Sequence, residues 1–125
     1  NGFEPDQQSI DQAKGLARSG AAIQISHDPS EAVDGAQALY TDVWASMGQE
    51  KQQVERQKAF QGFCLDRTLL AKADPRAIVL HCLPAHRDEE IGANLIDCEA
   101  SRIFDQAENR LHAQQALLAT LLGGL

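Results

Sequence analysis

The chain has 125 residues, of which 43% are hydrophobic and 23% charged, a composition typical of one folded globular domain. Its net charge of −7, with no lysine or arginine run to offset it, makes nucleic acid and anionic membranes poor partners. No apolar run approaches the roughly 20 residues that cross a bilayer, and the first residues lack the basic-then-apolar order of a signal peptide, so we expect a cytoplasmic location.

The first third of the chain predicts helix, strand and helix. Apolar residues recur at helical spacing over residues 10–17, and Gly20 provides a C-terminal stop. Residues 21–26 favour a short strand. The segment Asp28-Pro29-Ser30-Glu31 then combines an N-cap with a proline at the first helical position, which predicts a brief second helix.

Two further strands are predicted in the middle of the chain. Residues 38–44 favour a buried strand, and the polar segment 50–61 suits an exposed helix. Asp66 is placed to cap a short helix that ends before Pro75, and residues 77–82 favour the next strand. Beyond it we expect a helix over 88–97, an extended segment over 102–104, and a last helix from Asp105 that ends at Gly123-Gly124.

This alternation of helices and strands predicts an α/β fold, a three-layer parallel sheet with helices on both faces. Right-handed crossovers place the carboxyl ends of all parallel strands along one edge, and ligands bind at that edge in open sheets of this kind. We therefore expect His27, Asp42 and Cys82 to lie along the functional edge.

The three cysteines, Cys64, Cys82 and Cys98, are odd in number and widely spaced, without a CxxC pair or a histidine at metal-ligand spacing. A disulfide framework and a zinc site are therefore not expected, and Cys64 and Cys98 fit small buried hydrophobes. Cys82 differs because it ends an apolar run. As a nucleophile it would need a basic partner and a lowered pKa; alternatively, Cys82 and the carbonyl of Leu83 orient an amine or amide substrate.

Other side chains suit an anionic or zwitterionic ligand. Arg110, predicted in the first turn or so of the last helix, suits a phosphate or carboxylate there, or a salt bridge to Glu108. Asp42 suits an ammonium group with Ser46 holding a carboxylate, although Asp42 is also able to cap a turn. The four histidines are expected to be structural or solvated rather than catalytic bases: His27, His81, His86 and His112.

Three segments in this order resemble signatures of the ornithine carbamoyltransferase family, and the likeness runs over essentially the whole chain. They are Asp42-Val43-Trp44-Ala45-Ser46-Met47-Gly48, similar to its DxxxSMG loop, His81-Cys82-Leu83-Pro84, similar to its HCLP motif, and Ala107-Glu108-Asn109-Arg110, similar to its carbamoyl phosphate segment. The resemblance implies that residues 1–125 form the Rossmann-like ornithine-binding domain. Aspartate carbamoyltransferases lack the SMG and HCLP signatures, and putrescine has no α-carboxylate to hold, so ornithine is the favoured amine. Asp88 stands where the family often has glycine, which implies a local loop effect.

The resemblance also implies roles for individual residues. Asp42, Ser46 and Met47 would hold the α-amino and α-carboxylate groups of ornithine, and Arg110 would bind carbamoyl phosphate. Cys82 and the carbonyl of Leu83 would lie beside the reacting δ-amine and the carbamoyl NH₂. The neutral δ-amine attacks the carbamoyl carbonyl and expels phosphate, giving citrulline for arginine biosynthesis, with no metal or organic cofactor.

The amino-terminal carbamoyl phosphate domain of the family, with its STRTR and HPxQ segments, has no counterpart in this sequence. We therefore expect the chain alone to be inactive, and do not carry over to it the homotrimer of the full-length family. Without that domain, the apolar face of the last helix would be exposed, so that its leucines promote self-association. Two alternatives stay open: a stand-alone amino acid binding or regulatory module, and a carbamoyltransferase for another amine such as acetylornithine.

Overall fold

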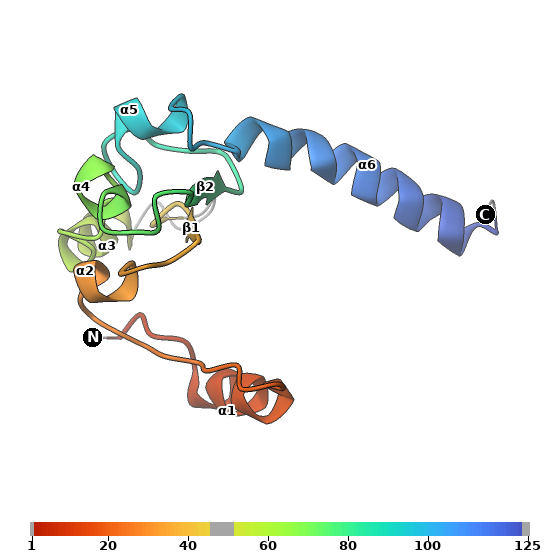
Figure 1. Cartoon of the computed structure of the whole chain (residues 1–125), viewed down its shortest axis with the longest axis horizontal. Helices are drawn as coiled ribbons and strands as arrows, with labels where there is room; N and C mark the ends of the chain where they lie inside the picture. The colour runs from red at the N-terminus through yellow and green to blue at the C-terminus, as the bar shows by residue number, and fades with distance from the viewer. Residues whose placement is uncertain (1, 46–51, 124–125) are drawn as a thin grey trace.

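A computed structural model of the chain describes residues 2–45 and 52–123 (Figure 1). The elements in chain order are α1 (Gln7–Leu16), α2 (Pro29–Ala32), β1 (Ala38–Thr41), α3 (Gln53–Ala59), α4 (Arg67–Leu70), β2 (Ile78–His81), α5 (Ala93–Ile96) and α6 (Ile103–Leu121). None of these helices is long and apolar enough to cross a membrane.

The two strands form a parallel pair in the register Ala38↔Ile78 to Thr41↔His81. Parallel strands need a long crossover between them, which here contains α3 and α4. On the other side of β2, the segment before α6 adds a parallel bridge, in which the Val79 amide donates to Ala100 at 2.9 Å and the Arg102 amide donates to Val79 at 2.9 Å. The predicted α/β class with a parallel sheet is confirmed.

The core lies around β2 and the segments that follow it. Val79, Ile91, Leu95 and Ile103 are completely buried, and they come from β2, the turn after it, α5 and the start of α6. These elements thus share one hydrophobic cluster although α5 is only four residues long. By contrast, α6 extends away from the cluster as a single helix beyond its first turns (Figure 1).

The predicted strand over 21–26 is wrong, because these residues form no regular element and pair with no strand among the described residues. A strand is stable only when a neighbour accepts its backbone hydrogen bonds and its apolar side chains are covered. Ile23 and Ile25 are instead exposed. His27 is consequently absent from the sheet edge, and its Nε2 lies 3.0 Å from Oε1 of Glu4.

The predicted helix over 88–97 is also largely wrong, since only Ala93–Ile96 is helical. Asp88 adopts φ 65°, a left-handed conformation that ends helices and that aspartate tolerates better than most residues. Its Oδ1 accepts from the amide of Ala93 at 2.8 Å, so the residues between form a turn. The expected local effect of Asp88 is thus a left-handed turn residue where the resembled family often has glycine.

The last helix begins at Ile103 rather than Asp105, and the predicted extended segment over 102–104 is therefore wrong. Burial of Ile103 in the core explains the earlier start, because Arg102 at the N-cap makes no side-chain capping bond. Arg110 consequently lies at the end of the second turn, and not at the helix start where backbone amides would help to bind an anion.

Candidate active site

Asp42 and Cys82 meet at the carboxyl ends of the two strands. Thr41 and His81 are register partners at the last positions of β1 and β2, so the residues that follow them emerge side by side. The thiol of Cys82 donates to Oδ1 of Asp42 across 2.9 Å. Two of the three residues expected at this edge are therefore in contact, and only His27 is elsewhere.

The environment of Cys82 favours a neutral thiol. Partial burial raises the pKa of the Cys82 thiol above its ordinary value, and the hydrogen bond to Asp42 raises it further because only the protonated thiol is able to donate to the carboxylate. A cysteine nucleophile needs the opposite, a pKa lowered by a cationic partner. The geometry therefore favours Cys82 as an orienting group over Cys82 as a nucleophile.

Tyr40 and Gln106 extend the contact network toward α6. The hydrogen bond between the Tyr40 hydroxyl and Cys82 raises the pKa of Tyr40. Nε2 of Gln106 lies 3.3 Å from the same hydroxyl, and Oε1 of Gln106 accepts from the His81 amide at 3.1 Å. One side chain from the first turn of α6 thus contacts both strands.

Arg110 lies one helical turn beyond Gln106 on α6. Residues four apart share a helix face, so Arg110 is on the face that Gln106 turns toward the strand ends. Its side chain is exposed and makes no hydrogen bond or ion pair with Asp42 or Cys82 among the described residues. Ser46 and Met47, the other predicted ornithine-binding residues, lie outside the residues that the structure describes.

The turn that carries Leu83 is held by His81. The Nδ1 atom of His81 accepts from the amide of Leu83 at 2.8 Å, where Leu83 has a φ of 56°. Because Nδ1 is an acceptor, the ring proton is assigned to Nε2, which lies 3.2 Å from Oε1 of Glu90. His81 is therefore completely buried and hydrogen-bonded through both ring nitrogens.

Glu90 is the residue of this turn that sequence reasoning missed. It is completely buried, and its Oε1 accepts from the His86 amide at 2.6 Å as well as from His81. One carboxylate oxygen thus joins both ends of the segment that contains Cys82 and Leu83. The sequence holds no local signal for this, since Glu89 and Glu90 are adjacent acids and only the fold turns one of them inward.

Groups that are able to hold a metal lie beside this turn and not at the strand ends. Within the described ranges, His86, Glu89 and Glu90 are the three-residue group whose ligand atoms come close together. Asp42 and Cys82 by themselves supply two atoms that already bond to each other. Asp42 and Cys82 therefore belong to no three-ligand group among the described residues.

Comparison with protein families matches residues 1–121 to the family described as aspartate/ornithine carbamoyltransferase, Asp/Orn binding domain. A curated protein of Prochlorococcus marinus (strain MIT 9313), named ornithine carbamoyltransferase, is 68% identical over 124 residues. Another of that name, from Parasynechococcus marenigrum (strain WH8102), is 66% identical over 124 residues. Each match covers 99% of this chain but only 39% of the relative.

The solved structures give the same result. The ornithine carbamoyltransferase of Pyrococcus furiosus superimposes with a TM-score of 0.88 at 49% identity, covering 99% of this chain and 40% of that one. The chain thus spans about two fifths of the length of the relatives that it matches.

Proposed function

The chain belongs to the aspartate/ornithine carbamoyltransferase family, as its Asp/Orn binding domain, and we propose that it is the ornithine-binding part of an ornithine carbamoyltransferase. The complete enzyme would transfer the carbamoyl group of carbamoyl phosphate to the δ-amine of ornithine, giving citrulline and phosphate in arginine biosynthesis. The observation that carries this proposal is the 68% identity, over nearly the whole chain, to a protein named ornithine carbamoyltransferase.

The contact between Asp42 and Cys82 at the strand ends supports a role in positioning the amine. In the proposed complex, the carboxylate of Asp42 binds the α-ammonium of ornithine, and Ser46 and Met47 bind its α-carboxylate. The neutral thiol of Cys82, already aligned by Asp42, lies beside the δ-amine, which must itself be neutral to attack. The carbonyl of Leu83 accepts hydrogen bonds from the amine or the carbamoyl NH₂.

Catalysis on this proposal comes from orientation and charge stabilisation, without a covalent enzyme intermediate. Arg110 would bind the phosphate of carbamoyl phosphate, since a guanidinium matches phosphate oxygens in pairs. Its position on the Gln106 face of α6 places the charge on the side of the strand ends. One guanidinium leaves most oxygens of a phosphate group without a partner. The remaining phosphate ligands would therefore come from the carbamoyl phosphate domain of a longer protein.

We extend the proposal to the activity of the isolated chain, the oligomeric state of the full-length enzyme and its location. The 125-residue chain alone would be inactive, and the full-length enzyme would form a homotrimer, which rests on the family resemblance. A cytoplasmic location would suit the three free thiols of Cys64, Cys82 and Cys98, because a reducing compartment keeps thiols unpaired.

A domain replacement tests the proposed substrate. The matched 124 residues of the Prochlorococcus marinus relative would be exchanged for this chain, and product formation measured with ornithine, acetylornithine and putrescine in turn. We expect citrulline from ornithine and little turnover of the other two amines. Preference for acetylornithine would identify a carbamoyltransferase for another amine, and tight calorimetric binding of ornithine to the chain alone would indicate a stand-alone binding module.

A substitution in the same chimera tests the proposed role of Asp42. Asp42→Asn removes the charge that pairs with the α-ammonium, so the KM for ornithine should rise about tenfold or more while the KM for carbamoyl phosphate changes little. Asp34→Asn, in an exposed turn away from the strand ends, is the matched control. An unchanged KM for ornithine in Asp42→Asn would contradict this role.

A further inference from the structure

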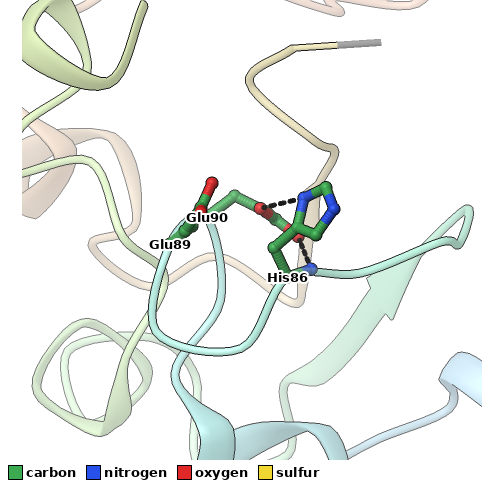
Figure 2. A group of neighbouring side chains, drawn as sticks. All are labelled: His86, Glu89 and Glu90. Atoms are coloured by element: carbon green, nitrogen blue, oxygen red, sulfur yellow. Dashed lines mark hydrogen bonds and ion pairs between the residues drawn. The ribbon is translucent and has the colours of Figure 1, made fainter. Parts of the chain in front are cut away.

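Three potential metal ligands converge in the turn that follows β2. His86, Glu89 and Glu90 each offer one ligand atom, and these atoms lie within 4.8 Å of one another. Figure 2 shows the imidazole of His86 beside the carboxylate of Glu90, with Glu89 adjoining on the same turn. Neighbouring acids alone do not make a metal site, so the case depends on the state of Glu90.

Glu90 carries an unsatisfied oxygen inside the protein. Its side chain is 0% exposed, and while Oε1 accepts two hydrogen bonds, Oε2 has no hydrogen-bond partner among residues 2–45 and 52–123. Buried carboxylate oxygens are nearly always paired, because loss of water without a replacement partner is costly. Nδ1 of His86 lies 3.8 Å from Oε2, which is beyond hydrogen-bond distance.

That separation fits two ligands of one metal ion. Zinc lies about 2.0–2.2 Å from nitrogen and oxygen ligands in tetrahedral sites, so adjacent ligand atoms are about 3.4 Å apart. The observed 3.8 Å between Nδ1 of His86 and Oε2 of Glu90 needs a closure of only a few tenths of an ångström. A hydrogen bond between the same two atoms would need them to come much closer.

The surroundings also resemble an outer ligand shell. Ligating carboxylates are usually oriented by hydrogen bonds from neighbouring groups. Here Oε1 of Glu90 is held by His81 at 3.2 Å, and Oε1 of Glu89 accepts from Gln57 at 3.2 Å. The adjacent cation Arg87 is engaged with Asp97 and the Ala93 carbonyl and does not compensate the carboxylates.

We propose that His86, Glu89 and Glu90 bind a divalent transition-metal ion, with zinc as the representative cation and a coordination position left for water. One imidazole and two carboxylates suit zinc better than magnesium or calcium, which prefer oxygen ligands alone. Because Glu90 also holds His81, the bound ion would steady the segment that carries Cys82 and Leu83. This proposal departs from the sequence-based expectation of no metal. That expectation rested on the cysteine spacing, which does not concern this group, and on the family resemblance, which implies a reaction without a metal cofactor; the proposed ion would hold the turn and take no part in the reaction.

Cobalt(II) and zinc titrations of the 125-residue chain test the site directly. We expect one equivalent of cobalt to give visible absorption without a thiolate-to-metal charge-transfer band, and zinc to displace it. His86→Asn and Glu89→Gln should each weaken zinc binding at least tenfold. His112→Asn, on the exposed face of α6, is the control and should bind as the parent chain does.

Several outcomes would overturn the proposal. Absence of saturable binding would do so, as would equal binding by His86→Asn, Glu89→Gln and the control. A thiolate band, or loss of binding after alkylation of the cysteines, would place the metal on the thiols instead. Circular dichroism shows whether each variant is folded. If His86→Asn does not fold, the zinc affinity of Glu89→Gln alone tests the proposed site.

Discussion

The turn after β2 and the last helix differ in how completely the chain covers them. In the turn, His81, Glu90 and Ile91 are completely buried, and nearly every polar atom has a partner. On α6, burial ends after the first turns: Ile103 is 0% exposed, whereas Leu118 is 57% exposed. The domain is therefore packed tightly where it presents Cys82 and is uncovered along the helix that carries Arg110.

This difference marks α6 as the element on which a partner would pack. A helix with an apolar stripe normally buries that stripe against another element. The exposed leucines of α6 are Leu111, Leu117, Leu118, Leu121 and Leu122, a set too large to be scattered surface residues. Relatives named ornithine carbamoyltransferase are about two and a half times as long as this chain, and an α6 partner within such a longer protein would cover the stripe.

The contrast in burial predicts a large difference in stability between two leucine substitutions. Leu95→Ala removes a completely buried side chain from the core and should lower the free energy of unfolding by about 2–5 kcal/mol. Leu118→Ala on α6 should change it by less than about 0.5 kcal/mol, as expected for an exposed position. Urea unfolding of both variants measures this, and equal losses would mean that α6 is packed in solution.

The buried carboxylate of the turn predicts a second loss of stability. Glu90→Ala leaves His81 Nε2 and the His86 amide without their acceptor, at a cost of about 1–3 kcal/mol for each donor that stays buried. Glu99→Ala, at an exposed position, is the control. Chemical denaturation of the two variants compares them. A stability of Glu90→Ala equal to the control would show that Glu90 does not hold the turn.

The uncovered helix predicts weak self-association of the chain. A combined Leu117→Ser, Leu118→Ser and Leu121→Ser variant should remain a monomer at concentrations where the parent chain associates, since these side chains are exposed. Light scattering across a concentration series measures the average mass. A parent chain that stays strictly monomeric at high concentration would contradict this prediction.

The hydrogen bond at the strand ends predicts a shift in titration. The Asp42 carboxylate stabilises the protonated thiol of Cys82, so Asp42→Asn should lower the pKa of Cys82 toward its ordinary value. Alkylation rates as a function of pH report this pKa, with Cys64→Ser and Cys98→Ser in both proteins so that a single thiol reacts. With the lower pKa, the half-maximal rate should occur at lower pH in Asp42→Asn. A shift to higher pH would contradict the assigned hydrogen bond.

Sequence reasoning succeeded where the signal is local. The capping residues Asp28 and Asp66 start helices as predicted, accepting from the amides of Ser30 at 2.8 Å and Leu69 at 2.9 Å. The meeting of Asp42 and Cys82 also follows from two strand ends and the rule for parallel sheets. These features depend on a few consecutive residues or on a general topological constraint.

It failed where a distant contact decides the local structure. Residues 21–26 have strand-like composition but no neighbouring strand among the described residues. The helix α6 starts at Ile103 because that side chain is buried in the core. Which of Glu89 and Glu90 turns inward depends on His81, nine residues before Glu90. The functional assignment came from motif resemblance, because the contact between Asp42 and Cys82 does not identify a ligand.

Citrulline formation, measured side by side, tests the account most directly. The 125-residue chain alone and the chimera with the Prochlorococcus marinus relative would receive the same ornithine and carbamoyl phosphate. If the chain carries only the ornithine-binding half of the active site, the chain alone should form no detectable citrulline. The chimera should then turn over at a rate near that of the parent relative. Citrulline from the isolated chain, or a folded chimera without activity, would contradict it.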